Sequence, residues 1–92
     1  MPDSFKSQFK DLLKNIKISY YNNKKSIVTV KDSYILMDSF SIQFIKPLLE
    51  FNEPGEAYEK TIKNNYEISL SEYEQIVIQL LNKIEKESKS PN

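Results

Sequence analysis

The sequence of 92 residues contains no cysteine and no histidine. Without thiolate or imidazole ligands, a zinc, haem or iron–sulfur centre is excluded on chemical grounds. A serine nucleophile would lack a histidine base, and there is no cysteine to act as a nucleophile. We therefore expect no metal, no cofactor and no enzymatic activity. A chain without disulfides is typical of a cytoplasmic protein.

Arginine is also absent, and glycine occurs once. A single glycine excludes the glycine-rich loops that hold phosphate groups. All 13 basic residues are lysines and they balance 13 acidic residues, so the chain lacks the positive charge that nucleic-acid binding requires. No apolar run approaches the ~18 residues of a membrane span, and the N-terminus does not resemble a signal peptide. We expect neither a nucleic acid nor a membrane as partner.

The length permits one domain with one modest hydrophobic core. Hydrophobic residues make up 39% of the chain and charged residues 28%. These proportions are those of a folded domain rather than of a disordered segment. The sequence therefore predicts a small binding protein.

The N-terminal segment, residues 1–17, has apolar residues at helical spacing. These residues are Phe5, Phe9, Leu12, Leu13 and Ile16. The pattern predicts an amphipathic helix that packs against the rest of the domain. The alternative is a surface helix that docks on a partner enzyme.

Three short strands are predicted next, over residues 18–21, 26–31 and 34–37. The turns between them contain asparagine, lysine, aspartate and serine, so they are short enough for an antiparallel meander. The second and third strands carry apolar residues at adjacent positions, such as Ile35 and Leu36. A sheet with one wet face would alternate polar and apolar residues, so we expect both faces to be covered, one of them by the N-terminal helix.

The remaining chain predicts three helices, over residues 38–49, 56–65 and 69–84. Pro47 lies inside the first, which we therefore expect to be short or kinked. The last helix has two candidate capping boxes, Ser69 with Glu72 and Ser71 with Glu74. Residues 85–92 are predicted to be a polar, frayed tail. The fold class is α+β, with a three-stranded antiparallel meander followed by three helices and preceded by an extra helix.

Several segments within residues 16–84 match a known residue pattern. Leu36–Ser39 joins the third strand to a helix that carries the bulky pair Phe44–Ile45. An aromatic, an acid and an aliphatic residue follow in Tyr66–Ile68, and a polar cap opens the long helix from Ser69. In this order the chain resembles the PqqD-like peptide chaperones, also called RiPP recognition elements. The resemblance implies a winged-helix-like peptide-binding domain over residues 18–84.

Members of that family bind the leader of a ribosomally made precursor peptide and present it to a modifying enzyme. The resemblance implies that the leader adds as a strand to the third strand, over a groove formed with the last helix. An edge strand offers unpaired backbone groups for such an addition. The expected peptide-binding residues are Tyr34, Ile35, Leu36, Met37, Ile76, Gln79, Leu80 and Lys83.

Ile76 stands where the family often carries an acidic residue, which implies a more apolar groove. For Ile76 and Leu36 the alternative is plain core packing. The partners implied are a leader peptide and a peptide-modifying enzyme. The oligomeric state stays open between monomer and homodimer, because a free edge strand also permits self-pairing.

Two other functions fit the same composition. One is a winged-helix DNA-binding protein, although Glu72 and Glu74 at the tip of the last helix would repel phosphates. The other is a small inhibitor of phage or toxin–antitoxin type that binds one protein by its surface. The carboxylates Glu53, Glu56 and Glu59 are close in sequence but have no second catalytic group, so they indicate a solvated charged face rather than an active site.

Overall fold

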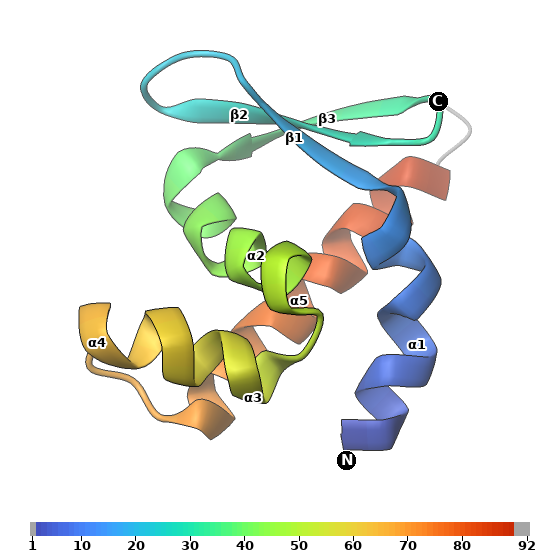
Figure 1. Ribbon diagram of the computed structural model, residues 1–92. Coiled ribbons are helices and arrows are strands. Elements are labelled where there is room, and N and C mark those ends of the chain that lie inside the picture. The colour runs from blue at the N-terminus through green and yellow to red at the C-terminus, as the bar shows by residue number, and fades with distance from the viewer. Residues whose placement is uncertain (1, 90–92) are drawn as a thin grey trace.

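The computed structural model describes residues 2–89, and it describes side chains from Phe9 to Ser88. Four helical regions lie on one side of a three-stranded sheet, within a molecule of 35 × 31 × 18 Å (Figure 1). The elements are α1 (Pro2–Asn15), β1 (Ile16–Tyr20), β2 (Lys25–Val30), β3 (Ser33–Asp38), α2 (Ser39–Phe51), α3 (Pro54–Ala57), η1 (Tyr58–Ile62), α4 (Lys63–Asn65) and α5 (Leu70–Lys89). This order confirms the α+β class and the meander followed by three helical regions.

The sheet has the strand order β1-β2-β3, with both pairs antiparallel. Val28 in the central strand lies opposite Ile18 on one side and Ile35 on the other. Val28 is fully buried, and Ile35 and Met37 are nearly so. These residues share the face of the sheet that packs on the helices, because side chains two positions apart point to the same side.

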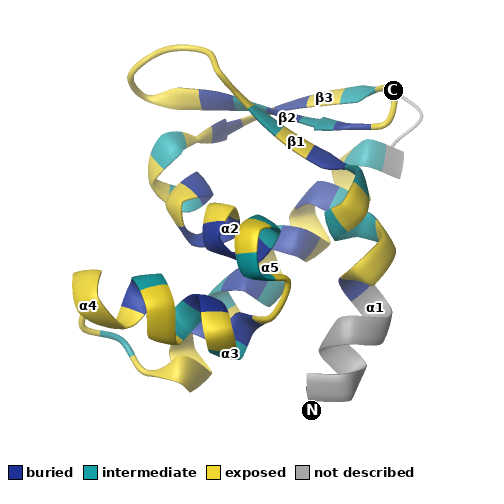
Figure 2. Cartoon of the chain, viewed as in Figure 1, coloured by how far each residue is buried: buried dark blue, intermediate teal, exposed yellow. Residues whose placement is uncertain are grey.

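The opposite, outer face of the sheet is open, so the expectation that both faces are covered is wrong. Tyr34 is 78% exposed and Leu36 is 51% exposed. The helix α1 joins the other helices on the inner side, where Phe9 is fully buried (Figures 1 and 2). No residue separates α1 from β1, and the first residue of β1, Ile16, is itself buried against the core. The adjacent apolar residues of β3 therefore divide between a buried face and an exposed one.

The expected role of the N-terminal helix in packing is confirmed by Phe9, with Leu12 and Leu13 partly buried against the core. Phe5, the first residue of the predicted stripe, lies outside the residues whose side chains are described. The strand β1 starts two residues earlier than predicted, at Ile16.

The helices after the sheet differ from the prediction in three places. The helix α2 runs through Pro47 to Phe51, two residues beyond the predicted end, so it is not short, and it ends on Asn52, whose φ of 66° is left-handed. The predicted helix over residues 56–65 begins at Pro54 and has a π-helical turn, η1, in its middle. The helix α5 extends beyond residue 84 to Lys89, so residues 85–89 are helical rather than frayed, and residues 90–92 lie outside the described part.

The start of α5 follows one of the two predicted capping boxes. The backbone N–H of Ser69 donates to Glu72 Oε1 (2.8 Å), and the Glu72 N–H donates to Ser69 Oγ (3.1 Å). Both bonds of the box are therefore formed. The buried face of this helix carries Tyr73, Val77, Leu81 and Ile84, which are fully buried, whereas Leu80 is partly buried. Among the described residues, no helix combines the length and apolarity that crossing a bilayer requires.

Candidate functional site

The strand β3 is an edge of the sheet, and its free backbone groups can be assigned from the ladder. The Ser39 N–H donates to the Lys24 carbonyl oxygen (2.9 Å), one step beyond the last β2–β3 pair. Hydrogen-bonded and non-hydrogen-bonded pairs alternate along an antiparallel ladder. Because Ser39 and Lys24 form a hydrogen-bonded pair, Met37, Ile35 and Ser33 also turn their N–H and C=O groups toward β2. The peptide groups of Tyr34 and Leu36 consequently point away from the sheet, to the open edge.

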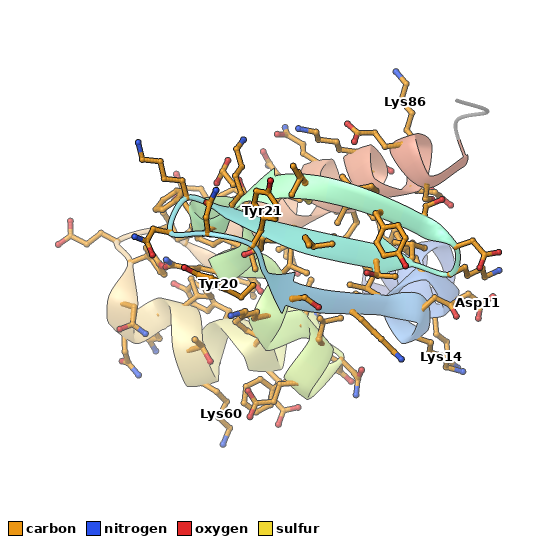
Figure 3. All side chains as sticks on the ribbon, turned by 90° about the horizontal axis from the view of Figure 1, so that it is seen from above. Asp11, Lys14, Tyr20, Tyr21, Lys60 and Lys86 are labelled. Carbon is orange, nitrogen blue, oxygen red and sulfur yellow. The ribbon has the colours of Figure 1, made fainter. Side chains whose placement is uncertain are left out.

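The C-terminal end of α5 lies beside this edge, and the helix slopes away from the sheet toward its N-terminus (Figure 1). Ser33 Oγ at the start of β3 donates to the carbonyl oxygen of Ser88 near the end of α5 (3.1 Å). Seen from above, α5 emerges beyond β3, on the side of the sheet opposite to β1 (Figure 3). A strand added to β3 would therefore lie over the C-terminal part of α5.

Asp38 ends β3 and caps α2. Its carboxylate accepts hydrogen bonds from the Ser41 backbone N–H (2.7 Å) and the Ser41 hydroxyl (3.1 Å). The backbone bond from Ser41 is the main cause that lowers the Asp38 pKa, and the ammonium groups of Lys25 and Lys83 lower it further. Lys83 of α5 is thus close enough to the end of β3 to act on its charge.

The side of α5 that carries Lys83 also carries Ile76 and Leu80, because spacings of four and three place residues on one helix face. Ile76 and Leu80 are partly buried against the core, so part of each side chain remains accessible. Gln79 and Lys83 are exposed, and with Asn82, Lys86 and Glu87 they line an open hollow of about 490 Å³. Lys86 points away from the sheet in Figure 3.

The structure brings together only part of the predicted groove. Tyr34 and Leu36 point their side chains to the outer face of the sheet, so these two side chains do not face α5. The cause is the strand period of two, which sends Ile35 and Met37 inward instead. Ile35 and Met37 are buried, at 6% and 3% exposure. What lies beside the C-terminal part of α5 at this edge is therefore backbone of β3, with Lys83 near the end of the strand.

An exposed aromatic residue at the end of the β3 edge was missed by the sequence prediction. Phe40, in the first turn of α2, is 62% exposed. Its ring centroid lies 5.4 Å from that of Phe44 and 6.4 Å from that of Tyr66, edge-on to both. Phe44 in turn lies 6.4 Å from Tyr73 of α5. The sequence offers no local signal for this arrangement, because Phe40 meets Tyr66 from a segment 26 positions further along the chain.

The described part of the chain offers carboxylates but, like the whole sequence, no histidine or cysteine. The residues described there include no group of three carboxylate, histidine or cysteine side chains placed to hold a metal ion. Comparisons with models of known protein families, with curated proteins and with solved structures find no match to this chain.

Proposed function

We propose that the chain is a non-catalytic peptide-binding domain that takes up an extended segment at the β3 edge. The segment we expect is the leader of a precursor peptide, held for a separate peptide-modifying enzyme. The observation that carries the proposal is the row of outward peptide groups at Tyr34 and Leu36, at the sheet edge beside which α5 ends. Backbone bonds supply affinity in strand addition, and side-chain contacts supply selectivity. A meander followed by a helix along its third strand also supports the PqqD-like, winged-helix-like arrangement.

Of the two sheet edges, β3 is the one suited to strand addition. Proteins protect edge strands with lysine, proline or bulges, because unpaired backbone groups otherwise attract other chains. The strand β1 carries Lys17 near its middle, whereas β3 contains no lysine and no proline. Its one charged residue, Asp38, lies at its end and caps α2. We therefore place the peptide at β3.

The position of α5 favours a free peptide over the sheet edge of another folded protein. A second copy that paired through β3 would bring its own α5 into the space under the joined strands, where α5 of the first copy already lies (Figure 3). An isolated extended segment has no covering layer of its own and meets no such obstacle. The proposal therefore includes a monomer whose β3 edge is open to peptides.

One observation favours a second candidate function. The outer face of the sheet exposes Tyr34 and Leu36, and exposed apolar patches often mark protein-binding surfaces. This supports a small inhibitor that binds one protein through the sheet face. The two candidates depend on different atoms of Leu36, the side chain in the inhibitor and the backbone N–H in the peptide-binding domain.

A display library of random linear peptides, selected against the purified chain, tests the proposal. We expect enriched peptides to protect the amide of Leu36 from hydrogen exchange. Leu36→Pro removes the outward N–H without removing a bond to β2, and proline is tolerated at strand edges of this kind. We expect it to weaken binding about tenfold or more, whereas Leu36→Ala keeps the N–H and most of the affinity.

Equal losses in the two variants would instead favour binding through the sheet face. Circular dichroism must show native structure for both. Ile35→Pro is the internal contrast, because it removes a bond to β2 and should destabilise the fold itself. Absence of any enriched peptide would overturn the peptide-binding proposal.

Two substitutions in α5 test whether this helix contributes to peptide affinity. Ile76→Asp places a charge beside the bound strand and should weaken binding by about 1.5–3 kcal/mol, as expected for losing one buried apolar contact. Lys83→Ala removes an exposed charge and should cost less than about 1 kcal/mol. Titration of an enriched peptide into both variants measures the difference. A folded Ile76→Asp variant with unchanged affinity would remove α5 from the site.

A further inference from the structure

The aromatic residues at the end of the β3 edge form a connected cluster, defined here as Phe40, Phe44 and Tyr66. Phe44 and Tyr66 have ring centroids 5.0 Å apart, and Phe40 lies edge-on against both. The Tyr66 hydroxyl donates to the side-chain oxygen of Gln43, which ties the cluster across α2. The cluster is therefore held in place from two segments that are far apart in the sequence.

Within this cluster the burial is uneven. Phe44 is 6% exposed and Tyr66 is half-buried, but Phe40 is 62% exposed. Aromatic rings in contact usually bury most of their apolar area, and an exposed ring against a fixed cluster leaves a flat apolar surface for another group. Phe40 is thus the open end of an otherwise packed aromatic cluster.

The position of Phe40 relates the cluster to the peptide site. Phe40 follows the last residue of β3 by two positions and precedes Phe44 by one helical turn, and Phe44 contacts Tyr73 of α5. Phe40 therefore lies in the first turn of α2, just past the end of β3, and its neighbour Phe44 reaches α5. A strand paired with the outward groups of Tyr34 and Leu36 would continue past Asp38 toward this ring.

We infer that Phe40, backed by Phe44 and Tyr66, is a binding subsite for a large apolar side chain of the bound peptide, preferably an aromatic one. This inference rests on the proposed function. The aromatic side chain belongs to the part of the peptide just beyond the segment that pairs with β3. A peptide bound here carries an aromatic residue at a fixed distance from its strand-forming segment, and that distance selects among peptides that the backbone bonds alone would accept.

The test uses peptides enriched from the random library on the intact chain. We expect them to share an aromatic residue to one side of the segment that protects Leu36. Phe40→Ser should weaken their binding tenfold or more, and replacing the shared aromatic residue by alanine should do the same. The two changes together should cost little more than either alone, because they remove one contact. Tyr20→Ser is the matched control, since Tyr20 is 74% exposed but lies in β1 at the other edge, and it should leave affinity unchanged.

Failure of the subsite and failure of the proposed function give different results. If enriched peptides protect Leu36 but bind Phe40→Ser as they bind the unaltered chain, the subsite is wrong and strand addition stands. Fully additive losses from the two changes would also overturn the subsite, because they would show that the two side chains do not meet. If no peptide is enriched, the proposed function fails first. Phe40 is mostly exposed, so Phe40→Ser should fold, as circular dichroism would show.

Discussion

Tyr73 joins α5 to α2 through a single hydroxyl group. The side chain is fully buried, and its hydroxyl donates to the carbonyl oxygen of Phe44 (2.8 Å). Pro47 has no N–H to donate to the carbonyl oxygen of Gln43, so α2 lacks one backbone hydrogen bond next to Phe44. Contacts from other elements, such as the Tyr73 hydroxyl, therefore matter more for this part of α2. Burial raises the pKa of the Tyr73 phenol, which keeps the hydroxyl protonated and able to donate.

Removal of this hydroxyl should destabilise the domain measurably. We expect Tyr73→Phe to lower the free energy of unfolding by about 1–2 kcal/mol, because a buried carbonyl loses its side-chain donor. Urea unfolding followed by circular dichroism measures the change. Tyr20→Phe is the control, since the Tyr20 hydroxyl bonds to exposed Asn23 (3.2 Å) and its loss should alter stability little. Equal midpoints for Tyr73→Phe and the unaltered chain would contradict this account.

At the scale of elements, the capping of α5 allows a close comparison of two serines. Ser69 forms both bonds of its capping box with Glu72, whereas Ser71 is exposed one residue into the helix. We expect Ser69→Ala to cost about 0.5–2 kcal/mol in stability, the range measured for N-cap serines, and Ser71→Ala to cost little. The thermal unfolding midpoints of the two single variants show which serine caps the helix. A larger loss in Ser71→Ala would mean that the helix begins later in solution.

The helix α5 was predictable because its signals are local. A capping box and apolar residues every three or four positions fix its start and its buried face without reference to the rest of the chain. The faces of β3 were not predictable in the same way. Ile35 and Leu36 are both apolar, so the sequence predicts a strand but does not say which residue is buried. Only the layer of helices on one side decides that Ile35 is buried and Leu36 exposed.

The same limit applied to the candidate site. The free edge and the α5 residues Ile76, Leu80 and Lys83 followed from strand order and helical spacing. Phe40 did not follow, because its exposure depends on how α2 meets the Tyr66 segment, which lies 26 positions further along the chain. A contact between segments so far apart has no local signal in the sequence.

At the scale of the whole molecule, the sheet is narrower than the helical layer beneath it. Three strands at ~4.8 Å spacing span roughly 10 Å between the outer two, whereas the two longer dimensions of the molecule are 35 and 31 Å. The helices therefore depend on one another as well as on the sheet for burial. Phe9 is the residue of α1 that packs into this shared core, and its side chain is fully buried.

A charge at this position should disrupt the entire domain. We expect Phe9→Asp to unfold the domain or to lower its stability by several kcal/mol, because a buried carboxylate without a partner is costly and small domains have little stability in reserve. The neighbouring Lys10→Asp changes charge on an exposed side chain and should have a small effect. Denaturant midpoints compare the two. A native midpoint for Phe9→Asp would show that α1 is loosely attached and available for a partner.

The π-helical turn η1, Tyr58–Ile62, has a consequence for how chains of this kind can differ in length. A π turn holds its hydrogen bond between residues five apart, so it accommodates one residue more than the α-helix around it. Deletion of one residue there would restore α-helical bonding and leave the following segment close to its present orientation, because five residues of a π turn rotate by nearly as much as four residues of an α-helix. Tyr66 would then keep its place beside Phe44. A one-residue gap in an alignment at this turn would thus mark the loss of the π turn and not the loss of the aromatic cluster.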